Sequence, residues 1–188
     1  GGKKLNNQFN TIKNNDLNFI VYNFVDMLSH ARTEMEMIRE LASDEAAYRS
    51  ITLSWFKHSP LSDIVKKVAD NKMKLIITTD HGTKRVKNPI KVIGSKSTNS
   101  NLRYKVGRGL SYNEKEVFVV NSPQDAFLPQ TKLSSEYIFA GSEDFFVYPN
   151  NYSHYVNYFT NTFQHGGISL EEMLIPYVEL NPKSVLNA

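Results

Sequence analysis

The sequence predicts an α/β domain in which helices cover both faces of a sheet, giving three layers. The first observation is that short apolar runs, rich in β-branched and aromatic residues, alternate along the chain with amphipathic helical segments. The second is composition, since 188 residues with 40% hydrophobic and 12% aromatic content suit one globular domain or a large piece of one. We therefore expect the strands to form one sheet with flanking helices.

Several segments have the composition of strands, and two of them are apolar enough to be buried in the sheet. These two are residues 17–25 and 72–79, which are dominated by apolar and β-branched side chains. The other predicted strands are shorter and lie at residues 90–93, 116–121, 137–140, 145–148 and 175–180.

Four segments are predicted to be helical. Residues 31–48 place an apolar stripe opposite Glu and Arg side chains, as an amphipathic helix does. Pro60 suits the first turn of the next helix, and Ser59 before it suits the capping position. Residues 52–58 fit either state, and the remaining helices are predicted at residues 152–163 and 170–174.

The order of these segments suggests how the chain is divided. Residues 1–16 open with a glycine pair typical of a protease scar and continue as a linker rich in Lys and Asn. Residues 17–182 form the predicted domain, and residues 183–188 form a tail. Residues 84–112 are rich in Lys and Arg and include a Ser-Thr-Asn loop, so we expect an insertion with a mobile basic loop.

Composition excludes several classes of protein. A formal net charge of +3 is compatible with an anionic substrate but is too small for a nucleic-acid-binding stripe. The absence of cysteine excludes disulfides and thiolate metal sites. No apolar run reaches the length of a membrane span, so we expect no membrane partner and a cytoplasmic location.

Three short motifs carry side chains that bind metals. Asp80-His81-Gly82 follows a predicted strand, where open α/β sheets place their sites. Asp26 and His30 are four residues apart, so a helix would place them on one face. His165-Gly166-Gly167 adds a third imidazole on a loop that allows close backbone approach. Two carboxylates and three imidazoles suit zinc and exceed one tetrahedral site, which favours two ions.

Each motif also has a simpler interpretation. Asp26 could cap a helix while His30 packs, and the other two motifs could be solvated loops. We favour the metal because the three motifs together are less expected by chance than any one of them. His58, which precedes Ser-Pro, is interpreted as a turn residue, and His154 as a residue of the aromatic helix.

The basic region offers candidate substrate contacts. Arg103-Tyr104 combines a guanidinium fork with an aromatic ring that could stack on a base, and Arg85 is a further cation. The alternative is a solvated loop in which lysine and arginine serve solubility.

Taken in chain order, these motifs resemble the alkaline phosphatase superfamily. The block from His165 to Pro176, His-Gly-Gly-Ile-Ser-Leu-Glu-Glu-Met-Leu-Ile-Pro, is most similar to the PglZ domain, and cofactor-independent phosphoglycerate mutases have a similar block. Over residues 17–180 the chain resembles the C-terminal PglZ-type effector domain of PorX-like response regulators, which are two-component proteins linked to type IX secretion in Bacteroidetes.

The resemblance implies roles for five residues. One zinc would be held by Asp26, His30 and His165, and a second by Asp80 and His81. The family's remaining Asp and its Thr or Ser nucleophile lie on an earlier strand and helix that this sequence does not contain. We therefore expect the C-terminal part of an alkaline-phosphatase-like domain, inactive when isolated.

The resemblance implies a zinc-dependent phosphoesterase, with nucleotide or oligonucleotide phosphodiesters as substrates. It would be the output domain of a response regulator with a protein partner in secretion signalling, and a homodimer is compatible with this role. One alternative is a non-catalytic, zinc-stabilised effector that acts by binding a protein. A second alternative is phosphotransfer of the phosphoglycerate mutase type.

Overall fold

A computed structural model describes residues 9–130 and 135–183 of the chain. The backbone divides into two compact units, one made of residues 1–78 and 176–188 and the other of residues 79–175. The predicted mixture of helices and strands is confirmed. The described strands do not form one sheet, because they pair in four small sheets of two or three strands. The predicted glycine scar and most of the tail lie outside the described residues.

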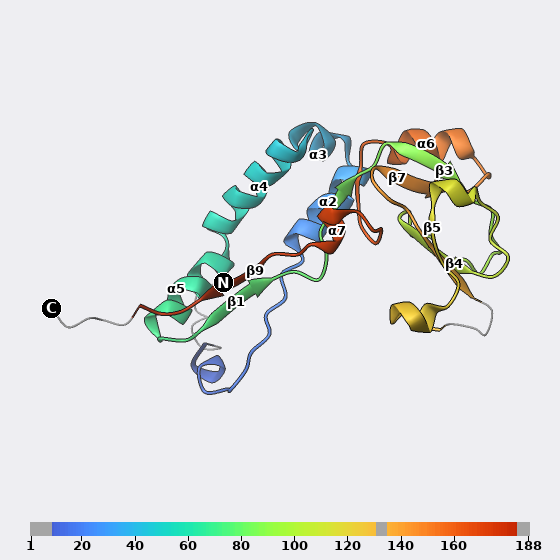
Figure 1. Ribbon diagram of the computed structural model, residues 1–188. Helices are drawn as coiled ribbons and strands as arrows, with labels where there is room; N and C mark the ends of the chain where they lie inside the picture. The colour runs from blue at the N-terminus through green and yellow to red at the C-terminus, as the bar shows by residue number, and fades with distance from the viewer. Residues whose placement is uncertain (1–8, 131–134, 184–188) are drawn as a thin grey trace. The chain divides into compact units, whose positions relative to one another are not determined.

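Helices dominate the first unit (Figure 1). The segment predicted as one helix over residues 31–48 is broken, because Met35 has an extended backbone and Asp44 starts a new helix by accepting a hydrogen bond from Ala47 N at 2.8 Å. The ambiguous residues 52–58 continue that helix. The helices are α2 (Phe24–Glu34), α3 (Glu36–Leu41), α4 (Glu45–His58) and α5 (Pro60–Asp70).

Helix α5 begins at Pro60, as predicted, and its apolar face is buried. Ile64 and Val68 pack against Phe9, so the segment predicted as a linker contributes to this core. Ser59 precedes the helix but does not cap it, since its hydroxyl donates to the Phe56 carbonyl. The proline ring therefore starts this helix without help from a side-chain cap.

Residues 17–23 do not form the predicted buried strand. No described strand pairs with them, and Phe19 and Val21 are 85% and 82% exposed. The helix begins at Phe24, whose ring stacks on Trp55 with 4.3 Å between the centroids. A β-rich composition makes a strand only where a neighbouring strand satisfies the backbone, and here an aromatic contact starts a helix instead. Asp26 therefore lies in the first turn of α2.

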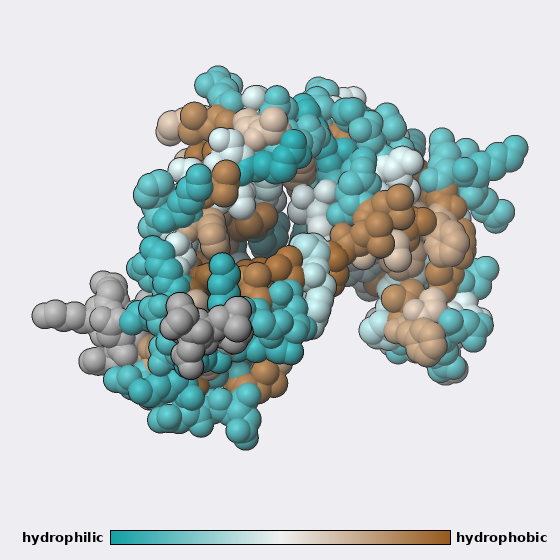
Figure 2. Space-filling model, turned by 60° about the vertical axis from the view of Figure 1, so that its left-hand side comes forward, coloured by the Kyte–Doolittle hydropathy of each residue, from teal (hydrophilic) through white to brown (hydrophobic). Residues whose placement is uncertain are grey.

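The first unit also contains an antiparallel pair of strands (Figure 1), β1 (Leu75–Thr78) and β9 (Tyr177–Leu180). Both were predicted as strands, but the predicted burial of β1 is wrong. Ile76 and Ile77 are 47% and 37% exposed, because a two-stranded ladder covers little of its own side-chain surface. Figure 2 shows that hydrophobic side chains reach the molecular surface in several patches.

The second unit contains the remaining strands, and the predicted strands at residues 90–93, 116–121, 137–140 and 145–148 all occur with shifted ends. One small sheet pairs β3 with β7 in parallel, a second pairs β2 with β8, and the third has the order β4-β6-β5. The strands are β2 (Lys84–Arg85), β3 (Asn88–Lys91), β4 (Tyr104–Gly107), β5 (Phe118–Val120), β6 (Glu136–Phe139), β7 (Asp144–Val147) and β8 (Phe163–Gln164).

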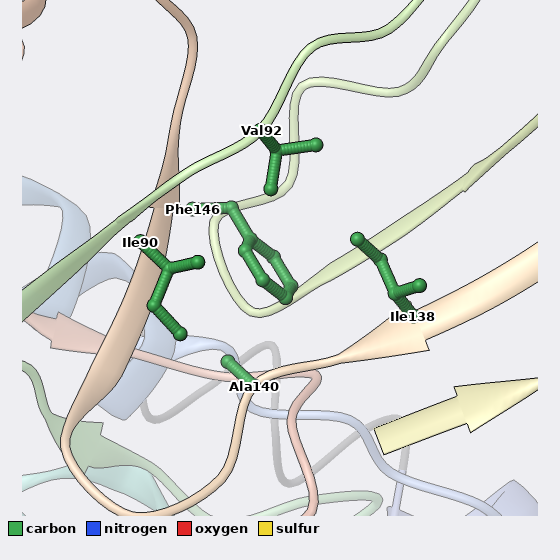
Figure 3. Close-up of a cluster of buried hydrophobic side chains, with 5 residues drawn as sticks. All are labelled: Ile90, Val92, Ile138, Ala140 and Phe146. Carbon is green, nitrogen blue, oxygen red and sulfur yellow. The ribbon is translucent and has the colours of Figure 1, made fainter. Parts of the chain in front are cut away.

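A cluster of apolar side chains joins two of these sheets (Figure 3). Its members come from β3 and β7, from β6, and from the residues that follow β3 and β6; they are Ile90, Val92, Ile138, Ala140 and Phe146. Residues 84–112, predicted as an insertion with a mobile basic loop, thus supply β2, β3, β4 and part of this core. Each of β3 and β4 has one buried residue, Ile90 and Lys105, although the segment as a whole is rich in lysine.

Two helices complete the second unit. Helix α6 (Tyr152–Phe159) lies beside β7 (Figure 1) and packs against a second cluster that contains Val86 and Phe145. Helix α7 (Leu170–Met173) is short and follows the glycine loop after His165. Within the described parts of the chain, none of the helices has the length and apolar character that a membrane span requires.

Candidate metal centre

In the second unit, two of the predicted ligands, 84 positions apart in sequence, lie in direct contact. The imidazole rings of His81 and His165 are stacked, with 3.9 Å between their centroids and 10° between their planes. Asp80 Oδ1 lies 3.7 Å from His81 Nε2, and the Asp80 side chain is 87% exposed. The structure therefore brings together two imidazoles and a solvent-facing carboxylate.

The turn after β1 positions Asp80 and His81. The Thr79 hydroxyl donates to the His81 carbonyl at 3.0 Å, which folds the backbone back at the strand end. His81 Nδ1 lies 3.0 Å from the Gly82 carbonyl oxygen, so the ring is held at this nitrogen. A hydrogen bond from its own backbone N–H lowers the pKa of Asp80, which keeps the carboxylate ionised and able to bind a cation.

Gly82 is required by the close approach of α7. Its N–H donates to the Glu172 carbonyl at 2.9 Å. A Cβ at this position would lie only 1.9 Å from the Glu171 carbonyl oxygen, which is far inside contact distance. The glycine therefore joins the Asp80-His81 turn to α7 in a way that no other residue allows.

The glycine loop after β8 positions His165. Gly166 has a φ of +104°, which favours glycine, and a Cβ there would meet the Tyr104 ring at 3.0 Å. Asn101 Nδ2 donates to the His165 carbonyl at 3.4 Å. The loop is thus held between β4, the segment before it and α7.

A buried ion pair supports this loop. Arg103 Nε donates to Glu172 Oε1 at 2.8 Å, and Nη2 donates to Oε2 at 2.6 Å. The same carboxylate accepts from Gly167 N at 3.0 Å and from the Ser169 hydroxyl at 2.6 Å. One carboxylate therefore organises β4, the glycine loop and the start of α7.

The charge of Glu172 is stabilised by its partners. Burial raises the pKa of this carboxyl, but hydrogen bonds from Arg103 and Ser169 outweigh burial, so that its pKa lies below the usual value. The sequence prediction missed Glu172 as part of the site. The sequence does contain a pattern that indicates this role, because Ser169-x-x-Glu172 has the spacing of a capping box, and the structure contains that capping box.

The predicted substrate contacts occupy different environments. Arg103 is fully buried, and besides Glu172 it donates to the carbonyls of Gly141, Ser142 and Asp144. This position supports a structural role for Arg103 in place of the substrate contact that the sequence suggested. Tyr104 is partly buried, stacks on Phe139 and borders Gly166, while Arg85 is partly buried on β2.

Asp26 and His30 lie in the first unit, on one face of α2. Asp26 Oδ1 is 3.6 Å from His30 Nε2, and both side chains are substantially exposed. Other side chains of α2 anchor the helix, because Ser29 Oγ lies 2.6 Å from Tyr48 Oη, and Arg32 Nη2 donates to the Ser43 carbonyl at 3.2 Å. The helix therefore presents the carboxylate and imidazole together.

The donor chemistry of both groups fits zinc. Each contains an imidazole and a carboxylate oxygen, which are the nitrogen and oxygen ligands that zinc accepts when thiolates are absent. The other two histidines are placed differently. His58 contacts the Ser54 carbonyl on exposed α4, and His154 packs against Tyr155 and Tyr158 of α6.

Comparison with known proteins adds one finding. The sequence model of one protein family, described as the BREX system PglZ alkaline phosphatase-like domain, matches residues 2–180. The match covers nearly the whole chain, including all five predicted metal ligands. None of the curated proteins matches the chain.

Proposed function

The chain belongs to the PglZ alkaline phosphatase-like family, and we propose from this that it is a phosphoesterase-type module that binds zinc. Alkaline phosphatase-like proteins generally depend on metal ions. The proposal extends the family assignment to a particular ion and to the side chains that would hold it.

The contact between His81 and His165 carries the proposal. The two imidazole rings lie with their centroids 3.9 Å apart, so two nitrogen-bearing ligand groups reach the same place from the turn after β1 and from the glycine loop. Imidazole nitrogen is a ligand that zinc accepts when thiolates are absent. The ionised, solvent-facing Asp80 beside them adds the negative charge that attracts a cation.

We assign Asp80 and His81 to one zinc, and His165 with Asp26 and His30 to another. This division between two ions follows the order of the motifs in the family. The contacts of His81 with His165 and Asp80, and of Asp26 with His30, support the choice of these five residues as ligands. When bound, zinc would polarise a phosphoryl group and stabilise the negative charge that develops on its oxygens.

The neighbouring residues prepare the site. The Arg103–Glu172 ion pair holds the glycine loop, and so fixes the backbone that carries His165. Tyr104, which borders Gly166, and Arg85 on β2 are our candidates for contacts to the substrate. We propose a phosphodiester of a nucleotide or oligonucleotide as the substrate, because an aromatic ring and a guanidinium suit a base and a phosphate.

The biological setting is a further part of the proposal. The sequence resemblance favours an output domain of a response regulator linked to type IX secretion, within a complete three-layer domain. One observation supports a protein-binding role as the second candidate function. Large apolar side chains are exposed on both strands of the first unit, including Ile76, Val178 and Leu180. Exposed apolar surface of this kind is typical of protein contacts.

Zinc stoichiometry tests the proposal without requiring turnover. Purified chain is incubated with zinc at pH 7.5, desalted and measured by elemental analysis. We expect about two zinc ions per chain if both groups bind, as two-ion sites of this type do. A chain that retains no zinc would contradict the proposed metal centre.

A further inference from the structure

A cavity in the second unit lies outside the predicted metal centre. Its volume is about 550 Å³, and it is lined by residues of the loop after β3, by β4, by β7 with the loop after it, and by α6. This volume is within the range of sites that hold small organic molecules. None of the predicted metal ligands is among the residues that line it.

The cavity wall contains a buried lysine. Lys105 on β4 is 1% exposed, and its Nζ donates to the Asn99 carbonyl at 3.2 Å. The same Nζ lies 4.2 Å from the centroid of the Tyr148 ring, whose hydroxyl also donates to Asn99 O. Among the described residues, no carboxylate lies within ion-pair distance of this ammonium. Within the described residues, its charge therefore faces a carbonyl dipole and an aromatic ring instead of an anion.

Burial has a measurable effect on this group. Removal from water lowers the pKa of Lys105 from 10.5 to about 8. The lysine is thus largely protonated at pH 7 although its surroundings disfavour the charge. A buried cation without an anionic partner is unfavourable, and an anion placed beside it would remove most of that penalty.

The remaining lining defines the kind of anion that fits. The lining residues include no Asp or Glu, and Lys96 is the second cation. Four of the lining residues are aromatic, namely Phe146, Tyr148, Tyr155 and Phe159. A single buried ammonium matches a single negative charge, and aromatic walls match a flat ring.

We propose that this cavity is a second ligand site, which binds a small planar aromatic carboxylate through Lys105. The carboxylate accepts a hydrogen bond from Lys105 Nζ, while the ring packs among Phe146, Tyr148 and Phe159. This site is separate from the phosphoester site, and it stands whether or not the chain binds zinc.

Isothermal titration calorimetry at pH 7 measures the binding of 2-naphthoate to the whole chain and so tests this site. The uncharged 2-naphthamide serves as a matched ligand, and Lys105→Met is compared with Lys91→Met, which removes an exposed lysine outside the cavity. We expect 2-naphthoate to bind the natural chain and Lys91→Met equally. Loss of one charge-assisted hydrogen bond should weaken binding to Lys105→Met about tenfold to a hundredfold.

The pH dependence gives a test that needs no variant. The titratable groups that line the cavity are Lys96, Lys105, Tyr148 and Tyr155. Burial raises the pKa of Tyr148 above 10, so this phenol stays neutral below pH 9. As Lys105 loses its proton, affinity for 2-naphthoate should fall about tenfold between pH 7 and pH 9. Repeating the titration with Lys96→Met separates the contribution of Lys96.

Three results would overturn the proposal. They are the absence of 2-naphthoate binding at millimolar concentration, equal affinity for 2-naphthamide, and unchanged affinity in Lys105→Met. If Lys105→Met does not fold, a flat pH profile between pH 7 and pH 9 in the natural chain would overturn it equally.

Discussion

Arg103 and Glu172, 69 positions apart in sequence, form a buried ion pair with two hydrogen bonds of 2.8 and 2.6 Å. The pair connects the residue before β4 to α7, and Glu172 also accepts a hydrogen bond from Gly167 in the loop that carries His165. A contact made for stability thus also positions a predicted metal ligand.

Glu172→Gln should destabilise the second unit by about 3–5 kcal/mol, because it leaves Arg103 buried without its counter-charge. Urea unfolding monitored by circular dichroism measures the change. Glu171→Gln is the matched control, since the Glu171 side chain is 53% exposed and its ion pair with Lys84 should contribute about 0–1 kcal/mol. Equal losses in the two variants would contradict the role of the buried pair.

The same pair predicts sensitivity to acid. Because the folded pKa of Glu172 lies below the ordinary 4.5, its stabilising contribution is present above about pH 4.5 and is lost as pH falls through the folded value. The difference in unfolding free energy between the natural chain and Glu172→Gln should therefore shrink below pH 4. A difference that stays constant from pH 7 to pH 3 would refute this linkage.

Gly82→Ala should displace α7 from the turn that carries His81, since the new Cβ would lie 1.9 Å from the Glu171 carbonyl oxygen. We expect a loss of about 1–3 kcal/mol in stability, with lower zinc content. Gly141→Ala is the matched control, because its Cβ would meet no atom within 4 Å. Thermal unfolding and elemental analysis measure both variants, and normal zinc content in Gly82→Ala would show that α7 does not support the centre.

His165→Ala should lower the zinc content by roughly one ion per chain, because zinc needs several protein ligands and this variant removes one of the three proposed for the ion assigned to Asp26, His30 and His165. His154→Ala provides the control, since its ring lies on α6 against Tyr155 and Tyr158. Elemental analysis after desalting makes the comparison. Unchanged zinc in His165→Ala would remove this residue from the centre.

Lys105→Met should stabilise the folded chain at pH 7, because the folded pKa of about 8 lies below the ordinary 10.5 and protonation disfavours folding. The gain is about 3 kcal/mol at 1.36 kcal/mol per pKa unit. Burial of the charged Lys105 lowers the free energy of unfolding by its full amount below about pH 8. This loss disappears as pH rises to about 10.5, because the folded chain gives up the proton before the unfolded chain does. Urea unfolding at pH 7 and pH 10 measures the gain, which should be smaller at pH 10. Lys91→Met should show neither effect.

Most individual elements could be predicted from local pattern. The proline at the start of α5 and the apolar runs of β1, β6 and β7 specify their structure within a few residues. The strand predicted at residues 17–25 was wrong for a physical reason. Strand formation depends on a partner elsewhere in the chain, and composition alone does not supply one.

Some features of the candidate site could likewise be predicted from local sequence, whereas others depend on contacts between distant residues. The sequence by itself determined which residue types could bind a metal and their order along the chain, as well as the need for glycine after His81 and His165. Only the tertiary structure decided that the rings of His81 and His165 touch, that Arg103 pairs with Glu172, and that Lys105 is buried in a cavity wall. Local patterns reflect forces between near neighbours, whereas burial and pairing arise between residues that are distant in sequence. A basic segment therefore looks like a solvated loop until its partners are known.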